Sequence, residues 1–229
     1  MTDDSGLLYL LQVTSAAFPS GSFAHSAGFE TLLADGTIVD RKTLRTYADQ
    51  WLELSVAPSE GVAACLAHNA RGVNDLETLL ALDCTLTALK SGKEAYDASV
   101  TTGRATLRAI AGAFGDCTAT YADAVQRNCA AGHAAVVFGV CAQERGVDRY
   151  TALSAYLFTA YANLVGVVGR LLPLGQRDVQ GLLADCHPLV HQCTNRAETM
   201  NIDEICSMTP LLEIAGMRHE RLTTRLCIS

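Results

Sequence analysis

The sequence has little that favours β-structure. Aromatic residues make up 6% of the 229 residues, with a single tryptophan, and Ala and Leu outnumber the β-branched and aromatic types that strands prefer. No alternating run of apolar and polar residues extends beyond a few positions, and no segment repeats at a fixed spacing. A linker rich in Pro, Gly and Ser is also missing. These absences predict an all-α fold, a single globular bundle of about ten helices.

Positive charge is scarce as well. The chain carries 17 Lys and Arg against 24 Asp and Glu, a formal net charge of −7, and no basic cluster stands out to neutralise phosphates. The start, MTDDSG, is acidic and lacks the basic region of a secretory signal. Nine cysteines occur without any Cys-x-x-Cys spacing, which is typical of reduced thiols in a packed core. We therefore expect a cytoplasmic protein that does not bind nucleic acid.

What the sequence does contain is a long uncharged stretch between Thr151 and Gly169, within a predicted helix over 150–172. A helix that is apolar on all sides either crosses a membrane or forms the centre of a larger helical domain. Polar residues such as Ser154 and Asn163, together with several Ala and Gly, make this one too weakly hydrophobic for lipid. Small residues instead suit close packing of neighbouring helices. The pattern predicts a buried central helix and no membrane span.

Local signals place the boundaries of other helices. Asp40 is a suitable N-cap for a helix that Pro58 should end, and Asn74 is a suitable N-cap for the next. Helical spacing predicts one helix over 118–145 and another over 176–193. The expected helices therefore follow one another with short connections along the chain.

One candidate for catalysis is Ala24-His25-Ser26-Ala27-Gly28, which is close to the Gly-x-Ser-x-Gly nucleophile elbow of hydrolases. That elbow requires a buried strand before the serine and a βαβ pattern after it, whereas residues 18–22 read FPSGS, a loop pattern. The glycines instead permit close backbone approach, and Ser22 or Ser26 can cap a helix that starts near Glu30. A hydrolase that uses Ser26 is one alternative, but the pattern favours a protein that is not an enzyme.

A candidate metal site lies at Cys186, His187, His191 and Cys193. Two histidines four residues apart share a helix face and can chelate a divalent metal, with a cysteine near each. Pro188 fits such a helix only in its first turn. Neutral His and Cys are also common on half-buried helices, and the sequence does not fix a fourth ligand. The alternative function is therefore a nickel or zinc carrier that uses this cluster.

The C-terminal residues 207–229 combine apolar side chains with charged and polar ones. The residues singled out here as candidates for partner binding are Thr209, Pro210, Met217, Arg218, His219, Glu220 and Arg225. A terminus with this much apolar surface should dock, either on its own domain or on a partner that buries it. We expect 207–229 to be a partner-docking tail that belongs to the same domain as the helical residues 1–206.

Three motifs occur in an order and spacing that span nearly the whole chain. The first, over 7–30, contains Pro19, Gly21, His25, Ser26, Gly28 and Glu30. The second contains Arg170, Pro173, Gly175 and Gln176. The third, over 209–226, contains the partner-binding candidates named above. Together the three resemble the UreF family of urease accessory proteins.

That resemblance implies an all-α, cytoplasmic homodimer with no catalytic site and no cofactor of its own. It implies that the chain binds the accessory protein UreD, called UreH in some bacteria, and recruits the GTPase UreG, so that the assembly delivers nickel to apo-urease. At matching positions, the segment from Ser207 to Arg225 would order on UreD and support UreG recruitment. Arg170 and the 173–176 turn would lie at the centre of the protein, near the nickel path or the UreG-facing surface.

The sequence departs from the family pattern at three places. Cys227 stands where the family has an aromatic residue, and Lys93-Glu94 replaces an Arg-Glu pair. The cluster over 186–193 belongs to no family motif. This last departure leaves open whether the chain contacts nickel directly.

Overall fold

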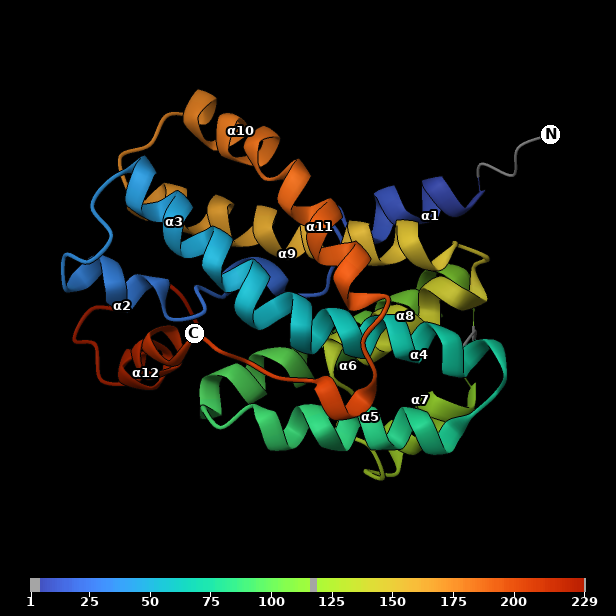
Figure 1. Ribbon diagram of the computed structural model, residues 1–229. Helices are drawn as coiled ribbons and strands as arrows, with labels where there is room; N and C mark the ends of the chain where they lie inside the picture. Colours follow the sequence, from blue (N-terminus) through green and yellow to red (C-terminus); the bar gives the residue numbers. More distant parts are fainter. Residues whose placement is uncertain (1–4, 116–118, 229) are drawn as a thin grey trace.

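The structure, a computed structural model, describes residues 5–115 and 119–228 (Figure 1). Within these ranges it contains helices and turns and no strand, which confirms the all-α prediction. The α-helices are α1 (Ser5–Val13), α2 (Phe29–Ala34), α3 (Arg41–Trp51), α4 (Val62–Gly72), α5 (Leu76–Leu89), α6 (Lys93–Phe114), α7 (Ala119–Gln126), α8 (Ala134–Glu144), α9 (Arg149–Leu171), α10 (Gln176–Asp185), α11 (His187–Ala197) and α12 (Pro210–His219). Short 3₁₀-helices, η1 (Ser22–Ala24) and η3 (Ile202–Glu204), and a π-helix, η2 (Leu52–Gly61), complete the elements.

Helix α9 is the predicted central helix. It begins where the side chain of Asp148 accepts a hydrogen bond from the backbone N–H of Thr151, a standard N-cap. Helices α2, α3, α4, α8, α10 and α11 all pack against it (Figure 1). Among the described residues, α9 is the one helix long and apolar enough to cross a membrane, and 50% of its most apolar window is buried inside the fold. Its apolar character is thus used for packing between helices.

Two hydrophobic cores lie on different sides of α9. The first core joins α9 to α2, α3, η2, α10, α11 and α12, and α9 contributes Leu157, Tyr161 and Val165 to it. The second core joins α1, α4, α5, α6, α7 and α8, and Ala152 of α9 reaches it. Two cores explain why the central helix has no polar face: each side of it meets a different layer of helices.

Pro58 does not end a helix, contrary to the prediction. The chain stays helical from Arg41 to Gly72, and Pro58 lies inside the π-helix η2. In a regular α-helix the proline ring would clash with the carbonyl of Leu54, four residues earlier. Here that carbonyl instead accepts a hydrogen bond from the backbone N–H of Met208 (2.8 Å), and the carbonyl of Pro58 accepts one from Cys206 (3.2 Å). The wider turn and these outside donors accommodate the proline.

The helix predicted over 118–145 is wrong, because α7 and α8 are separated by a turn at 127–133. The buried carboxylate of Asp83, on α5, fixes that turn by accepting hydrogen bonds from the backbone N–H groups of residues 131–133. It also accepts one from the hydroxyl of Tyr121 (2.8 Å). A turn determined by an acid 48 residues away cannot be read from local sequence.

Two other boundaries also differ from the predictions. Asp75, and not Asn74, caps α5 by accepting from the N–H of Thr78. The helix expected over 176–193 is divided at Cys186 into α10 and α11, with Pro188 in the first turn of α11, where its missing N–H is tolerated. The N-cap prediction at Asp40 is confirmed, since its carboxylate accepts from the N–H of Thr43 at 2.8 Å.

Candidate functional site

The N-terminal and C-terminal motifs lie against each other. Gly28, the residue before α2, has φ +85, and a Cβ built on it would lie 2.7 Å from both the backbone N of Gly216 and the carbonyl O of Leu212. No side chain fits between α2 and the backbone of α12 at this point, and the positive φ also favours glycine. Thr31 of α2 then donates from its hydroxyl to the carbonyl of Ala215 at 2.9 Å. Helix α12 therefore rests directly on the N-terminal motif.

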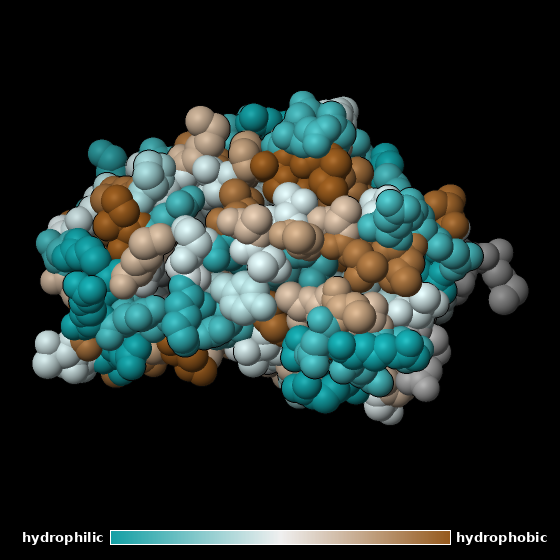
Figure 2. Space-filling view, turned by 90° about the horizontal axis from the view of Figure 1, so that it is seen from below, coloured by the Kyte–Doolittle hydropathy of each residue, from teal (hydrophilic) through white to brown (hydrophobic). Residues whose placement is uncertain are grey.

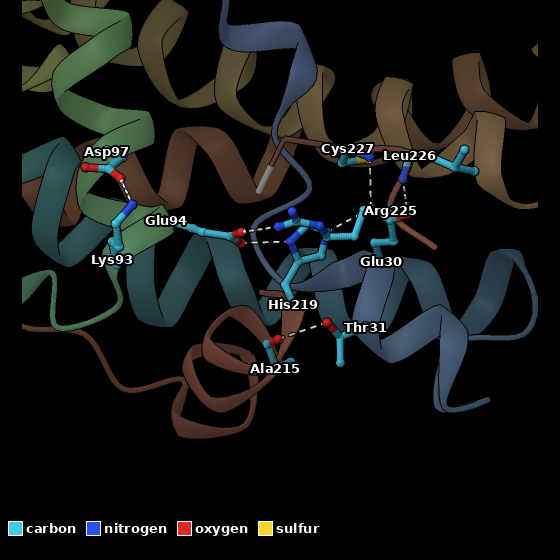
Figure 3. A network of polar contacts seen from close by, with 10 residues as sticks. All are labelled: Glu30, Thr31, Lys93, Glu94, Asp97, Ala215, His219, Arg225, Leu226 and Cys227. Atoms are coloured by element: carbon cyan, nitrogen blue, oxygen red, sulfur yellow. Dashed lines mark hydrogen bonds and ion pairs between the residues drawn. The ribbon is translucent and has the colours of Figure 1, made fainter. Parts of the chain in front are cut away.

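A buried polar network completes this contact (Figure 3). The imidazole of His219, with no exposed surface, lies between two carboxylates: its Nε2 is 2.9 Å from Glu30 Oε2 and its Nδ1 is 2.7 Å from Glu94 Oε2. Glu30 belongs to α2, Glu94 to the first turn of α6 and His219 to the last turn of α12. We call these three residues the triad. They join both ends of the chain to its middle.

The residues after α12 fold back onto the same two carboxylates. The guanidinium of Arg225 donates to Glu94 Oε1 at 3.0 Å, while the backbone N–H groups of Leu226 and Cys227 donate to Glu30 at 2.7 and 3.0 Å. Burial raises the pKa of Glu30, but hydrogen bonds from His219 and from these two N–H groups outweigh it and lower the pKa from its usual value. Burial and the negative charge of Glu30 raise the pKa of the Cys227 thiol to about 11.

The N-terminal loop that holds His25 also contacts α9. Asn163 donates to the hydroxyl of Ser22 at 3.2 Å, and Arg170, in the last turn of α9, donates to the carbonyl of Phe23 at 3.4 Å. Burial lowers the pKa of His25, although the nearby charge of Glu94 opposes the shift. Arg170 thus joins the second motif to the first.

The residues of the second motif lie at the surface of the chain, and their expected position near the nickel path or the UreG-facing surface stays a prediction. Arg170, Pro173, Gly175 and Gln176 are all exposed. Arg170 is exposed at the end of α9 while its guanidinium donates to Phe23, and Pro173 lies in the turn after α9 because proline cannot continue the helix. Gly175 is the N-cap of α10 and Gln176 its first residue. This turn forms the surface connection between α9 and α10.

The partner-binding candidates in the C-terminal segment, residues 207–228, divide into buried and exposed residues. Thr209 and His219 are buried. Pro210, Met217, Arg218, Glu220 and Arg225 are exposed, and Arg218 forms an ion pair with Asp35 at 3.4 Å. The buried members therefore hold the segment in place, and the exposed ones are accessible on the surface.

The outer face of α12 is strongly apolar. Its exposed hydrophobic residues are Leu211 (50% exposed), Ile214 (54%) and Met217 (43%), and Met208 (66%) lies just before the helix. In the view from below the molecule, which includes the side on which α12 and α5 lie, hydrophobic residues gather in patches between hydrophilic groups (Figure 2). Apolar residues grouped on one helix face, next to charged side chains, are typical of a protein-binding surface.

Behind α12 there is a cavity of about 320 Å³ between the two cores. Its wall includes Trp51, Ser55, Tyr156, Asn163, Leu212 and Met217. The ion pair between Lys90 and Glu60, with 2.7 Å between Nζ and Oε1, lies at the same wall and keeps both charges paired. Because α12 supplies part of the wall, movement of α12 would change access to this space.

The geometry around Ser26 does not resemble a hydrolase site. Ser26 has no exposed surface, and its hydroxyl lies 3.5 Å from the backbone N of Glu30. The described residues contain no strand on which a nucleophile elbow could stand. Nor does Ser26 cap α2, whose N-cap is Gly28. Ser26 is a buried residue beneath the docked C-terminal segment.

The four residues of the candidate metal site do not come together. Cys186 and Cys193 are buried in the first core, whereas His187 and His191 are exposed beside Phe158 and Tyr150. Burial raises the pKa of the Cys186 thiol to about 11 and that of the Cys193 thiol to about 12, which disfavours the thiolates that metals bind. Among the described residues, no group of three or more His, Cys, Asp or Glu side chains is arranged to hold a metal ion.

Sequence reasoning did not assign Glu94 to the site. The one signal in the sequence that points to Glu94 is that the pair Lys93-Glu94 replaces an Arg-Glu pair of the family. In the structure Lys93 turns away to Asp97 (2.7 Å), while Glu94 binds both His219 and Arg225. Cys227 likewise contributes through its backbone N–H, which any residue except proline supplies.

Comparison with known proteins gives a consistent result. The UreF family profile matches residues 38–187. The chain is 33% identical over 229 residues to the urease accessory protein UreF of Geobacillus kaustophilus (strain HTA426), covering 100% of both chains. It is 31% identical over 224 residues to the protein of the same name from Bacillus sp. (strain TB-90), covering 97% of this chain and 99% of that one. For the one from Paenarthrobacter aurescens (strain TC1) the identity is 32% over 223 residues, with 97% of each chain covered.

Proposed function

Because the chain belongs to the UreF family of urease accessory proteins, whose role is in urease maturation, we propose that it is a non-catalytic assembly protein that promotes nickel insertion into apo-urease. In this proposal it works in the cytoplasm as a homodimer, binds UreD (UreH) and recruits the GTPase UreG. Residues 207–229 are the docking part of the same domain as residues 1–206. Nickel is the cargo of the assembly.

The outer face of α12 is the observation that supports this function most directly. A short terminal helix with an exposed apolar face would lose much conformational entropy on binding if it were free in solution. In the structure Gly28, Thr31 and the triad hold the helix against α2 and α6. A preorganised apolar face beside the arginines Arg218 and Arg225 suits a partner protein with apolar and acidic groups.

Charge on the outer face of α12 should prevent capture of UreD. In the double variant Leu211→Asp, Ile214→Asp, both substitutions lie at positions at least half exposed, so the fold should persist. We expect the Kd for UreD to rise at least about thirtyfold, because the loss of a single interface hot spot costs about 2 kcal/mol or more. Titration calorimetry gives the Kd, and light scattering coupled to gel filtration gives the mass with UreD and then with UreG, GTP, Mg²⁺ and nickel.

Val73→Asp provides the matched control. Val73 is 76% exposed and lies in the turn between α4 and α5, at the opposite end of the molecule from α12 in Figure 1. It adds one negative charge at an exposed apolar residue, half of the charge that the double variant adds, and should leave the Kd unchanged. An unchanged Kd in the double variant would contradict the role of α12 as a docking surface. If the mass of the wild-type chain does not increase when UreD and UreG are added, the proposed function itself is contradicted.

A further inference from the structure

A buried histidine between α5, α6 and α8 is hydrogen-bonded to two hydroxyl groups. His133, the N-cap residue of α8, has no exposed surface. Its Nδ1 lies 3.0 Å from Ser99 Oγ on α6, and its Nε2 lies 3.0 Å from Thr87 Oγ1 on α5. The hydroxyl of Thr87 also donates to the carbonyl O of Asp83 at 3.0 Å. We call Ser99 and His133 the serine–histidine pair.

These contacts determine which nitrogen of His133 carries hydrogen. A carbonyl oxygen only accepts, so Thr87 donates its single hydroxyl hydrogen to Asp83. Thr87 must then accept from His133, which places the hydrogen of the neutral imidazole on Nε2. Nδ1 is left bare, so its contact with Ser99 forms only when the serine hydroxyl donates. A serine that donates to a base, with the base oriented by a third residue, is the arrangement of an activated nucleophile.

Backbone packing fixes the position of the pair. The carboxylate of Asp83 accepts hydrogen bonds from the backbone N–H groups of residues 131–133, which holds the turn before α8. Helix α6 passes this turn so closely that a Cβ built on Gly103 would collide with the carbonyl O of Gly132. Ser99 lies four residues before Gly103 and therefore on the same face of α6. The close approach of the two helices brings the serine hydroxyl to the imidazole.

The surroundings of His133 keep its imidazole available as a base. Burial lowers the pKa of His133, although the negative charge of Asp83 opposes the shift, so the ring is neutral at neutral pH. When the ring accepts a proton, that same negative charge stabilises the imidazolium. A neutral imidazole with a stabilised charged form is suited to take a proton from a serine.

Ser99 is part of the wall of the cavity of about 320 Å³. Thr102 and Thr106, on the same face of α6, continue this wall, and Phe138 and Tyr156 add aromatic surface. Pockets for small ligands typically have volumes of about 300–1,000 Å³ and are mostly apolar, with a few polar groups that fix the orientation of the ligand. The cavity therefore suits a small apolar molecule whose one polar group lies beside the hydroxyls of α6.

The N-terminus of α8 lies at the same wall. Ala134 is the first residue of this helix and lines the cavity. The N–H groups in the first turn of a helix have no partner within the helix and carry a partial positive charge. A carbonyl oxygen that becomes negative beside Ser99 would be stabilised by this charge.

We propose that Ser99 is a nucleophilic serine that takes the acyl group from a small apolar carboxylic ester bound in the cavity, with His133 as its base. The Ser99 oxygen forms a bond to the carbonyl carbon while its proton passes to Nδ1 of His133. The bond between the carbonyl carbon and the alcohol oxygen of the ester then breaks, and the leaving alcohol takes the proton from Nδ1. The products are an acyl group on the oxygen of residue 99 and a free alcohol. This modification site goes beyond partner docking and makes no use of the outer face of α12.

Peptide mapping by mass spectrometry on the full chain tests the proposal. The chain is incubated with p-nitrophenyl butyrate, an activated apolar ester, and the acylated fraction of individual serines is followed with time. We expect Ser99 to react at least about a hundredfold faster than Ser55, because a positioned general base contributes about 10²–10⁴-fold. Ser55 is the matched control within the same chain, since it lines the same cavity and its hydroxyl lies 3.0 Å from that of Ser207. Diisopropyl fluorophosphate, which forms a lasting adduct on serine, gives the same comparison if water removes the acyl group.

Substitutions around the pair separate base catalysis from simple accessibility. His133→Gln removes the base and should bring the rate at Ser99 down to that at Ser55. Thr87→Val removes the hydroxyl that orients the imidazole and should slow the reaction of Ser99 at least about tenfold. Thr85→Val is the matched control on α5, because the hydroxyl of Thr85 donates only to the carbonyl of its own helix at Ala81 (2.9 Å), and it should keep the wild-type rate.

Equal rates at Ser99 and Ser55 in the wild-type chain would overturn the proposal, and this comparison needs no variant. A folded His133→Gln variant that keeps the wild-type rate at Ser99 would overturn it as well. If His133→Gln does not fold, Thr87→Val decides, and an unchanged rate there would refute the role of the imidazole. None of these readouts involves UreD or UreG, so failure of this proposal is distinguishable from failure of the proposed function.

Discussion

Replacing Gly28 by alanine should detach α12 from the rest of the protein. The new Cβ would lie 2.7 Å from two backbone atoms of α12, on Gly216 and Leu212, and backbone cannot turn aside as a flexible side chain can. The residue also has φ +85, which is unfavourable for alanine. Together, the overpacking and the backbone strain should lower the free energy of unfolding by about 3 kcal/mol. We further expect rapid tryptic cleavage after Arg218. Denaturant unfolding measures the loss of stability, and proteolysis time courses measure the cleavage rate.

Gly36→Ala separates the two causes. Gly36, in the turn after α2, has φ +76, but no heavy atom lies within 4 Å of the position of its Cβ. The free energy of unfolding of Gly36→Ala should therefore fall only by the cost of backbone strain, about 1 kcal/mol. The C-terminal segment of this variant should stay resistant to trypsin. If the two variants unfold at the same denaturant concentration, the close approach of α12 to Gly28 makes no contribution, and α12 is not docked as described.

Replacing Asp83 by alanine should destabilise the second core even more widely. The carboxylate accepts hydrogen bonds from the Tyr121 hydroxyl and from the backbone N–H groups of residues 131–133, and only 2% of the residue is exposed. Each buried donor left without a partner is unfavourable by about 1–3 kcal/mol, so the sum should exceed about 3 kcal/mol. Denaturant unfolding measures the loss, and exchange at residues 127–133 should rise with it.

The matched control is Asp123→Ala, at an exposed acid on the neighbouring helix α7. It removes the same charge and should change the free energy of unfolding by no more than about 0.5 kcal/mol. A small effect at Asp83, comparable to that at Asp123, would mean that the turn between α7 and α8 is fixed by other contacts. A variant Asp83→Ala that is insoluble while Asp123→Ala is not would agree with the expected size of the effect.

Much of the architecture is predictable because it depends on local composition. The central helix follows from an uncharged stretch over 151–169, since this signal lies within the helix itself. The absence of strands among the described residues follows similarly from composition. The proximity of the first and third motifs is different. The sequence predicts that the apolar C-terminal residues dock, but not on which surface. The choice between their own domain and another protein depends on the shape of the folded surfaces.

Failures of prediction share a physical reason. The turn before α8 is fixed by Asp83 on another helix, and Glu94 becomes part of the triad only because α6 packs against α12. Pro58 is tolerated inside a helix because a distant segment supplies donors to the carbonyls nearby. In each case the decisive partner is far away in the sequence. Spacing rules that treat one helix at a time do not include such partners.

The π-helix also has a consequence for how the chain unfolds. The carbonyls of Leu54 and Pro58 are bonded by the backbone of Met208 and Cys206, and the hydroxyls of Ser55 and Ser207 lie 3.0 Å apart. The strip 206–208 therefore belongs to the same cooperative unit as the middle of the chain, while the residues after it can open separately. A truncation before residue 206 would leave both carbonyls of the irregular helix without these donors and destabilise the first core. A truncation after Met208 would keep these donors but remove α12, and with it Leu212 and Ala215 of the first core and the donors to Glu30.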